Sequence, residues 1–203
     1  RGVPQDYKTA VKWWRLAAEQ GNARAQYNLG VMYSKGRGVP QDDKTAVKWY
    51  KLAAEQGEAD AQYNLGQIYR QGEGVSQDYK TAVKWYKLAA EQGNARAQYI
   101  LGLMYGEGRG VPQDYKTAVK WWRLAAKQGD ANSQSNLGFM YANGWGVLQD
   151  YVRAHMWWNI AASSGQKKAV KNRDIAAGKM TSRQISKAQK LARECVAKKY
   201  KDC

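Results

Sequence analysis

The apolar residues of this chain fall into short stretches that have the spacing of a helix. After Gly21 they lie on one side of a helical turn with no intervening proline: Ala25, Leu29, Met32 and Tyr33. This spacing predicts a helix over residues 22–35, which we call helix A. Gly21 suits the left-handed backbone that ends the preceding helix. Asn22 suits the N-cap of helix A, because its side chain can accept hydrogen bonds from the first free amides.

A second amphipathic stretch follows a loop that contains glycine and proline. Pro40 cannot donate a backbone hydrogen bond and the glycines beside it tolerate positive φ, so helix A must end before it. Asp42 is the expected N-cap of a second helix, helix B, which ends at Gly57. Its apolar side combines small and large aromatic residues: Ala46, Trp49, Tyr50, Ala53 and Ala54. Small residues opposite large ones are typical of closely packed helix hairpins.

These two helices belong to a unit that repeats every 36 residues. The glycine of the loop recurs as Gly2, Gly38, Gly74, Gly110 and Gly146. A fixed period of roughly 20 to 50 residues is the signature of a solenoid, in which each repeat contacts only its neighbours. We therefore predict an all-α fold of stacked helix hairpins.

The stretch from Ala25 to Gly57 also resembles a known family. Its order of Ala-x-x-x-Leu-Gly-x-x-Tyr, Gly-x-Gly-Val and Ala-x-x-Trp-Tyr-x-x-Ala-Ala is similar to the Sel1-like repeat, a relative of the tetratricopeptide repeat with a longer loop between its helices. The resemblance covers almost everything from Gly2 to about Gly165. It implies a right-handed α/α superhelix of antiparallel hairpins that acts as a protein interaction scaffold, often bacterial and often exported.

The sequence suggests two segments. We expect the solenoid over residues 1–178, with a truncated first repeat, and a basic capping helix with its tail over residues 179–203. Because the chain starts at Arg1, part-way through a repeat and without an initiator methionine, we expect a fragment or a processed form. Thr181 and Gln184 form a capping-box pattern, which predicts a last helix over the open end of the stack. Its apolar stripe is Ile185, Ala188, Leu191, Ala192 and Cys195.

Helix A carries the main candidate for a binding surface. At 100° per residue its buried side holds Ala25, Gln26, Leu29, Gly30 and Tyr33, and the opposite side varies between repeats. By resemblance to the tetratricopeptide fold, this variable side would line a concave groove for a peptide or partner helix. It forms four rows, which we call the groove rows. The first is Arg24, Asp60, Arg96 and Asn132; the second Tyr27, Tyr63, Tyr99 and Ser135; the third Asn28, Asn64, Ile100 and Asn136; the fourth Val31, Gln67, Leu103 and Phe139.

The residue types in the groove rows favour recognition of a protein. Tyrosine supplies wide contact area, and asparagine can grip an extended backbone through both its donor and its acceptor. The alternative is that the tyrosine row only packs against the neighbouring hairpin. Our main hypothesis is a non-enzymatic, monomeric scaffold that binds a segment of another protein in this groove.

Helix B presents a basic outer face. The net charge is +16, and lysine or arginine recurs on the outer side of the first four helices B: Lys8, Lys12, Arg15, Lys44, Lys48, Lys51, Lys80, Lys84, Lys87, Lys116, Lys120 and Arg123. Aligned lysines could neutralise the phosphates of a nucleic acid or another polyanion. Glu19, Glu55 and Glu91, however, lie four residues after a basic residue, which favours ordinary pairing on a solvated helix surface.

Two cysteines, Cys195 and Cys203, lie in the basic tail. A disulfide between them would pin the tail and would imply an oxidising compartment such as a periplasm. The alternative is one buried thiol and one free terminal thiol, which would suit the cytoplasm. We favour the bond, and with it a periplasmic or secreted protein, because an unpaired terminal cysteine would be exposed and reactive.

Catalytic chemistry has little support in the sequence. His155, the only imidazole, takes the place of a valine in the other repeats and is most simply a packing variant. Asp42, Asp78, Asp114 and Asp150 suit helix caps, with paired-carboxylate catalysis as the alternative. Two cysteines and one histidine do not supply a tetrahedral metal set. The glycine-rich loop from Gly106 to Gly110 lacks the lysine and serine or threonine of a phosphate-binding loop.

One enzymatic alternative comes from the resemblance. A cysteine-rich branch of the family is associated with penicillin binding and weak lactamase activity, but this chain lacks the disulfide within each hairpin that marks that branch. We therefore expect no enzyme, no cofactor and no metal. No apolar run approaches the roughly 20 residues needed to cross a bilayer.

Overall fold

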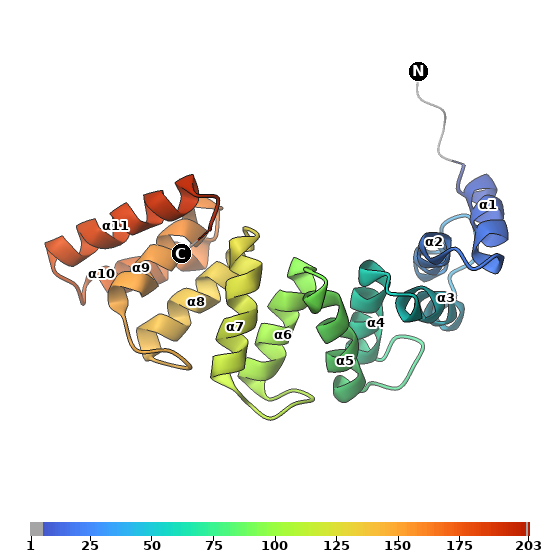
Figure 1. The fold of residues 1–203 in the computed structure, drawn as a ribbon, viewed down its shortest axis with the longest axis horizontal. Coiled ribbons are helices and arrows are strands. Elements are labelled where there is room, and N and C mark those ends of the chain that lie inside the picture. Colours follow the sequence, from blue (N-terminus) through green and yellow to red (C-terminus); the bar gives the residue numbers. More distant parts are fainter. Residues whose placement is uncertain (1–5, 202) are drawn as a thin grey trace, which may run out of the picture. The chain divides into compact units, whose positions relative to one another are not determined.

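A computed structural model of the chain describes residues 6–201 and residue 203. The described residues form eleven helices and no strand, which confirms the predicted all-α class (Figure 1). They divide into two compact units, Arg1–Asn94 and Ala95–Cys203. The first five residues of the expected solenoid, including Gly2, lie outside the described residues.

The helices of each unit follow the predicted order. The first unit holds α1 (Tyr7–Glu19), α2 (Ala23–Lys35), α3 (Asp43–Glu55), α4 (Ala59–Gln71) and α5 (Tyr79–Glu91). The second holds α6 (Ala95–Glu107), α7 (Tyr115–Lys127), α8 (Ala131–Asn143), α9 (Tyr151–Ser163), α10 (Lys167–Ala177) and α11 (Ser182–Ala197). Even-numbered helices up to α10 are helices A, and odd-numbered helices up to α9 are helices B.

The predicted caps bound the helices. The Asp42 carboxylate accepts hydrogen bonds from the Thr45 amide at 3.0 Å and the Thr45 hydroxyl at 2.6 Å. The hydroxyl bond, followed by the amide bond, lowers the pKa of Asp42 below its ordinary value. Asn22 likewise caps α2 through the Ala25 amide at 2.9 Å. The repeated aspartates therefore act as helix caps, as the simpler of the two interpretations predicted.

Helix A uses a glycine where an aromatic ring of the next helix B lies against it. A Cβ atom added to Gly138 would lie 2.6 Å from Nε1 and 2.7 Å from Cδ1 of Trp158. Trp158 is buried, and its Nε1 donates to the Ser135 carbonyl oxygen at 3.0 Å. The same contact joins Gly30 to Tyr50 and Gly66 to Tyr86 in the first unit. Backbone and ring can approach this closely only because the helix residue has no side chain.

The buried side of helix A is close to the prediction. Ala25, Gln26, Leu29 and Gly30 are buried, whereas Tyr33 is only half-buried and Met32 is buried in its place. The Tyr33 hydroxyl instead accepts a hydrogen bond from Arg15 at 2.8 Å. The predicted buried stripe is therefore only partly buried at Tyr33, which packs against the core of the first unit with part of its ring exposed, whereas the equivalent Tyr141 is buried.

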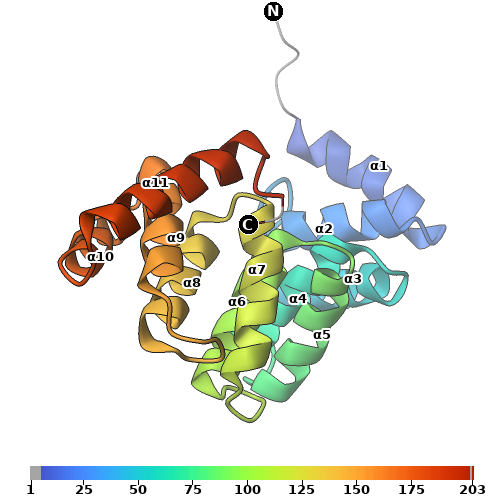
Figure 2. The same cartoon turned by 60° about the vertical axis from the view of Figure 1, so that its left-hand side comes forward.

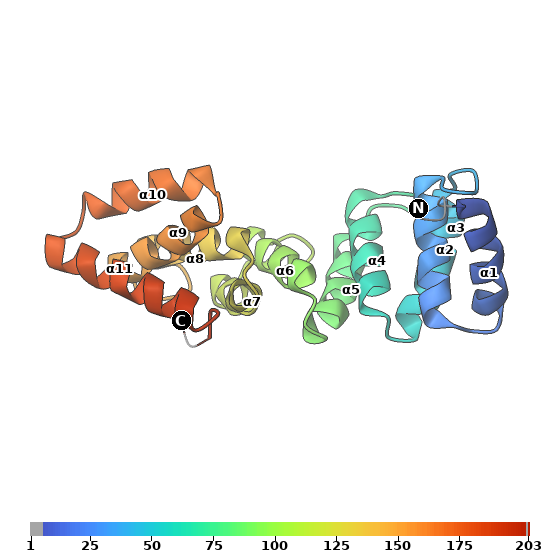
Figure 3. The same ribbon diagram turned by 90° about the horizontal axis from the view of Figure 1, so that it is seen from above.

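The last two helices both pack on α9. Figure 3 shows α9 between α10 and α11, and Figure 2 shows α11 lying across α9. The predicted capping box is confirmed, with Thr181 accepting from the Gln184 amide and Gln184 accepting from the Thr181 amide. The buried members of the predicted stripe are Ala188, Ala192 and Cys195. In the regular repeats a helix A packs on the helix B that follows it in the chain. The helix that follows α10 is α11, but α11 packs on α9 and so departs from the repeat.

Hydrogen bonds from an exposed glutamine to a buried one link successive repeats in each unit. The side-chain amide of Gln56 donates to Oε1 of Gln26 at 2.7 Å, and Gln92 donates to Gln62 at 2.8 Å. In the second unit Gln128 donates to Gln98 at 2.9 Å. The next glutamine acceptor, Gln134, is fully buried, and its Oε1 has no partner within the described chain. The missing donor is explained by the sequence, because Ser164 occupies its repeat position.

We expect Ser164→Gln to stabilise the second unit by about 1 kcal/mol, since it supplies the donor that Gln134 lacks. Urea unfolding of the variant and of the unchanged chain measures this difference. The same substitution in a Gln134→Met background is the control, because methionine keeps the size but removes the acceptor. An equal gain in both backgrounds would mean that the new glutamine acts elsewhere.

Candidate partner-binding surface

The groove rows lie on the accessible side of helix A in both units. None of the predicted residues is buried: Arg24, Arg96, Asn132 and Phe139 are exposed, and the others are partly exposed. The half-buried members are Tyr27, Asn28, Val31, Asp60, Tyr63, Asn64, Gln67, Tyr99, Ile100, Leu103, Ser135 and Asn136. Val31 and Leu103 also pack against the cores of their units, so the fourth row serves structure as well as surface.

In the first unit the charged residues of the first row pair with each other. The Arg24 guanidinium lies 2.7 Å from the Glu58 carboxylate and 3.5 Å from that of Asp60. Asp60 also accepts a hydrogen bond from the Asn94 side chain at 3.3 Å. Arg24 lies over the Tyr27 ring, 4.9 Å from its centre. These charges are therefore largely satisfied within the protein.

The tyrosines of the first unit are partly structural. The Tyr27 ring lies 6.0 Å from the Tyr50 ring, and the Tyr63 ring lies 5.8 Å from the Tyr86 ring. Burial raises the pKa of Tyr27, and it raises the pKa of Tyr86 to about 12. One side of each tyrosine thus packs against the neighbouring hairpin, as the structural alternative predicted. The other side remains accessible to a partner.

In the second unit the groove rows surround a depression of about 300 Å³. Its lining residues come from α6, α8, α10 and the N-cap position of α10: Tyr99, Asn132, Ser135, Asn136, Phe139, Gln166, Lys168 and Asn172. Five of them were predicted from the repeat. Lys168 and Asn172 were not, although each lies 36 residues after a row member, Asn132 and Asn136. Continuing the 36-residue step by one more repeat predicts both positions.

A second depression of about 290 Å³ shares Phe139 and Asn172 with the first. Its other lining residues are Ala142, Asn143, Gln149, Tyr151, Trp158, Ile175, Ala176 and Lys179. We call the two depressions together the α8–α10 surface. Neither is lined by an aspartate or a glutamate. Phe139 lies between them and is 42% exposed.

An aromatic cluster holds Phe139 in place. Its ring meets the Trp145 ring edge to face with 5.3 Å between centres, and Trp145 stacks on Tyr115 at 5.0 Å. Arg37, Glu73 and Arg109 occupy the position of Trp145 in the other repeats. The exposed aromatic pair is therefore specific to this repeat.

The basic face of helix B behaves as an ordinary helix surface. All its lysines and arginines are exposed. Lys51 pairs with Glu55 at 3.9 Å and Lys87 with Glu91 at 3.8 Å, each four residues apart. Arg123 donates to the Tyr141 hydroxyl at 2.7 Å, as Arg15 does to Tyr33. These contacts favour the solvated interpretation of this face.

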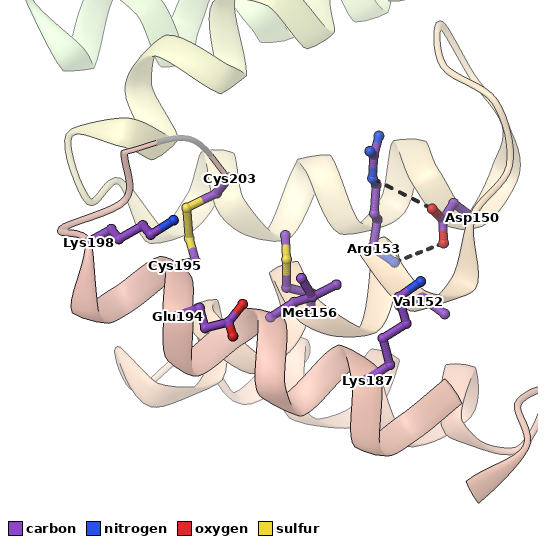
Figure 4. A pocket seen from close by; sticks show the side chains of 10 residues that line it. Asp150, Val152, Arg153, Met156, Lys187, Glu194, Cys195, Lys198 and Cys203 are labelled. Carbon is purple, nitrogen blue, oxygen red and sulfur yellow. Dashed lines mark hydrogen bonds and ion pairs between the residues drawn. A yellow bond between two sulfur atoms is a disulfide. The ribbon is translucent and has the colours of Figure 1, made fainter. Parts of the chain in front are cut away.

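A third depression, of about 410 Å³, lies between α9 and α11 (Figure 4). Its charged lining has both signs, and Asp150 pairs with Arg153 at 3.6 Å. The Cys195 and Cys203 sulfur atoms are bonded at one end of it, with 5.5 Å between their Cα atoms. Mixed charge and internal pairing give this depression no preference for a ligand of one sign.

The described residues hold no cluster of three or more histidine, cysteine or acidic side chains that could bind a metal ion. His155 is 3% exposed, and its Nδ1 has no partner within the described chain. Among the helices that the structure describes, none is long and apolar enough to span a membrane.

Comparison with known proteins identifies the repeat. The Sel1 repeat model matches residues 1–22, 23–58, 59–94, 95–130 and 131–166. A Sel1 repeat protein from Oxalobacter formigenes is 43% identical with a TM-score of 0.77, and the match covers 83% of this chain and 49% of that one. The chain thus spans about half of that relative's length. No curated protein matches the chain.

Two further solved structures have the same fold. A protective antigen of uropathogenic Escherichia coli that displays an SLR fold is 27% identical, with a TM-score of 0.58, and the match covers 98% of this chain and 59% of that one. Cysteine-rich protein B of Helicobacter pylori is 25% identical, with a TM-score of 0.51, over 65% of this chain and 95% of that one. The resemblance to Sel1 repeats seen in the sequence is confirmed.

Proposed function

The chain belongs to the Sel1 repeat family, and from this premise we propose that it is a non-enzymatic scaffold that binds an extended segment of a partner protein on the α8–α10 surface. Sel1 repeats generally form protein–protein interaction scaffolds. The observation that carries the proposal is the continuity of the groove rows. Seven of the eight residues that line the first depression occupy row positions once α10 is included.

The chemistry of this surface supports an extended protein segment as ligand. Asn136 and Asn172 carry side-chain amides that make no hydrogen bond within the described chain, so both donor and acceptor can serve a partner's backbone. Phe139 supplies an exposed apolar anchor between them. Aromatic anchors surrounded by polar groups are typical of the energetic centres of protein interfaces.

Selection from a random dodecamer peptide library on the immobilised full chain tests the proposal. We expect enriched peptides whose binding falls at least about tenfold in Asn136→Ala/Asn172→Ala, as for loss of central contacts. Tyr63→Ala/Asn64→Ala reports whether the first unit takes part. Binding that survives the amide substitutions but fails after Lys84→Ala/Lys120→Ala would overturn the groove and favour the basic face. That outcome, with steep salt dependence, would indicate a polyanion ligand.

We further propose that the protein works in an oxidising compartment, periplasmic or extracellular. The proximity of Cys195 and Cys203 supports this, because such bonds persist mainly outside the cytosol. Thiol titration of the denatured, unreduced protein isolated from its native compartment should find no free thiol. Two free thiols would contradict the proposal and favour the cytoplasm.

A further inference from the structure

We propose that the α8–α10 surface selects acidic segments, in which carboxylates flank an apolar residue. This inference rests on the proposed function and adds the chemistry of the partner. It starts from a comparison of two equivalent places, one in each unit. Both places are built from the same repeat positions and have the same backbone fold. Differences between their side chains therefore change the charge of the surface without changing the fold.

The first place is the charged cluster of α2 and α4. It contains one cation, Arg24, and two anions, Glu58 and Asp60, which pair across the repeat boundary. A partner would meet a slightly negative and internally satisfied surface there. This arrangement gives no reason to expect an acidic ligand in the first unit.

The second place lies 108 residues further along the chain, at Asn132, Gln166 and Lys168. Here the Gln166 side chain donates to Asn132 Oδ1, which keeps the link between repeats without charge. The position of Asp60 is taken by Lys168, which is exposed and forms no ion pair within the described chain. The net charge of the three positions thus changes from negative in the first unit to positive in the second.

A second cation stands at the other depression of the surface. The Lys179 ammonium donates to the Tyr151 hydroxyl at 3.3 Å and lies 5.3 Å from the centre of its ring. This contact positions the lysine without neutralising it. Both depressions therefore carry one cation and no carboxylate.

Acidic residues of α10 and of the α8 N-cap already have partners within the protein. Asp174 pairs with Arg173 at 2.8 Å, and Asp130 caps α8 through the Ser133 amide at 2.6 Å. Burial, followed by the charges of Asp130 and Glu107, raises the pKa of Tyr99, and Glu107 is itself paired with Arg109 at 2.8 Å. The cation that lines the first depression, Lys168, lies on α10. An acidic segment would thus place its carboxylates towards α10.

Apolar contact comes from the fourth row. Phe139 is 42% exposed and Ile175, its equivalent 36 residues later, is 56% exposed. They line the second depression together with Lys179, so apolar side chains and a cation lie around the same depression. A partner segment with an aromatic or aliphatic residue beside an aspartate or glutamate would contact both the apolar side chains and the lysine.

The experiment is the dodecamer selection with charge-reversed variants. The unchanged chain should enrich peptides rich in aspartate and glutamate around one large apolar residue. Lys168→Glu/Lys179→Glu should abolish this enrichment and lower the affinity of the acidic peptides by roughly a hundredfold, about tenfold for each cation. Because the whole chain is basic, general attraction must be excluded. Lys116→Glu/Lys120→Glu on α7 changes the net charge equally and should leave the acidic preference intact.

The outcomes separate this inference from the proposed function. If acidic peptides are lost equally in both charge-reversed variants, or retained in both, the inference is overturned. If the enriched peptides carry no charge bias yet lose binding in Phe139→Ala, the groove binds protein without selecting acidic segments. If neither Phe139→Ala nor Asn136→Ala/Asn172→Ala affects binding, the proposed function itself fails.

Discussion

Replacement of Gly138 by alanine should destabilise the second unit by about 2–3 kcal/mol, although alanine favours a helix interior over glycine by roughly 1 kcal/mol. The added methyl group would lie 2.6 Å from the Trp158 indole. The ring cannot easily move, because Trp158 is buried and donates a hydrogen bond to the Ser135 carbonyl oxygen. Urea unfolding followed by circular dichroism measures the change in unfolding free energy.

Gly178→Ala provides the matched control for this prediction. Gly178 has helical backbone angles, φ −63° and ψ −14°, and an added Cβ would meet only the Ile175 carbonyl oxygen at 3.5 Å. The same chemical change should therefore be neutral or slightly stabilising there. A Gly138 variant as stable as the Gly178 variant would show that the indole yields and that the glycine has no packing role.

This contact also shows what the sequence could and could not predict of the fold. The local sequence pattern predicts the repeat period, the ends of the helices and the aspartate caps. It also predicts that Gly138 lies on the buried side of its helix. The partner of that glycine is an indole 20 residues away on another helix, and the pattern alone does not pair them. The packing of α11 on α9 was equally hidden, because it breaks the rule that the repeat establishes.

The candidate surface could likewise be predicted from the sequence only in part. Except at Tyr33, helical periodicity separates the accessible row positions from the buried side of helix A, since exposure depends on local geometry. It does not reveal that Arg24 is paired with Glu58, whereas Lys168 forms no ion pair with any residue that the structure describes. This depends on which side chains of the next repeat come within reach. Comparing repeats therefore predicts where a partner could bind, while the contacts between repeats determine which positions are still available to it.

The acid stability of the second unit should depend on His155. Burial, followed by the positive charge of Arg173, lowers the pKa of His155, and Asp174 only partly opposes this. In the unfolded chain the imidazole titrates near its ordinary pKa of about 6.5. As the pH falls below that value, the unfolded state takes up a proton that the folded state resists. The unfolding free energy should therefore decrease between pH 7.5 and pH 5.

His155→Val tests this assignment, because valine occupies the equivalent position in four other helices B: Val11, Val47, Val83 and Val119. Urea unfolding at pH 7.5, 6.5, 5.5 and 5 should show a steady loss for the unchanged chain and a nearly flat profile for the variant. Arg173→Gln should give an intermediate slope, since it removes the neighbouring cation but keeps the imidazole buried. A slope that persists in His155→Val would assign the acid sensitivity to carboxylates, and the histidine would then be a packing variant without electrostatic consequence.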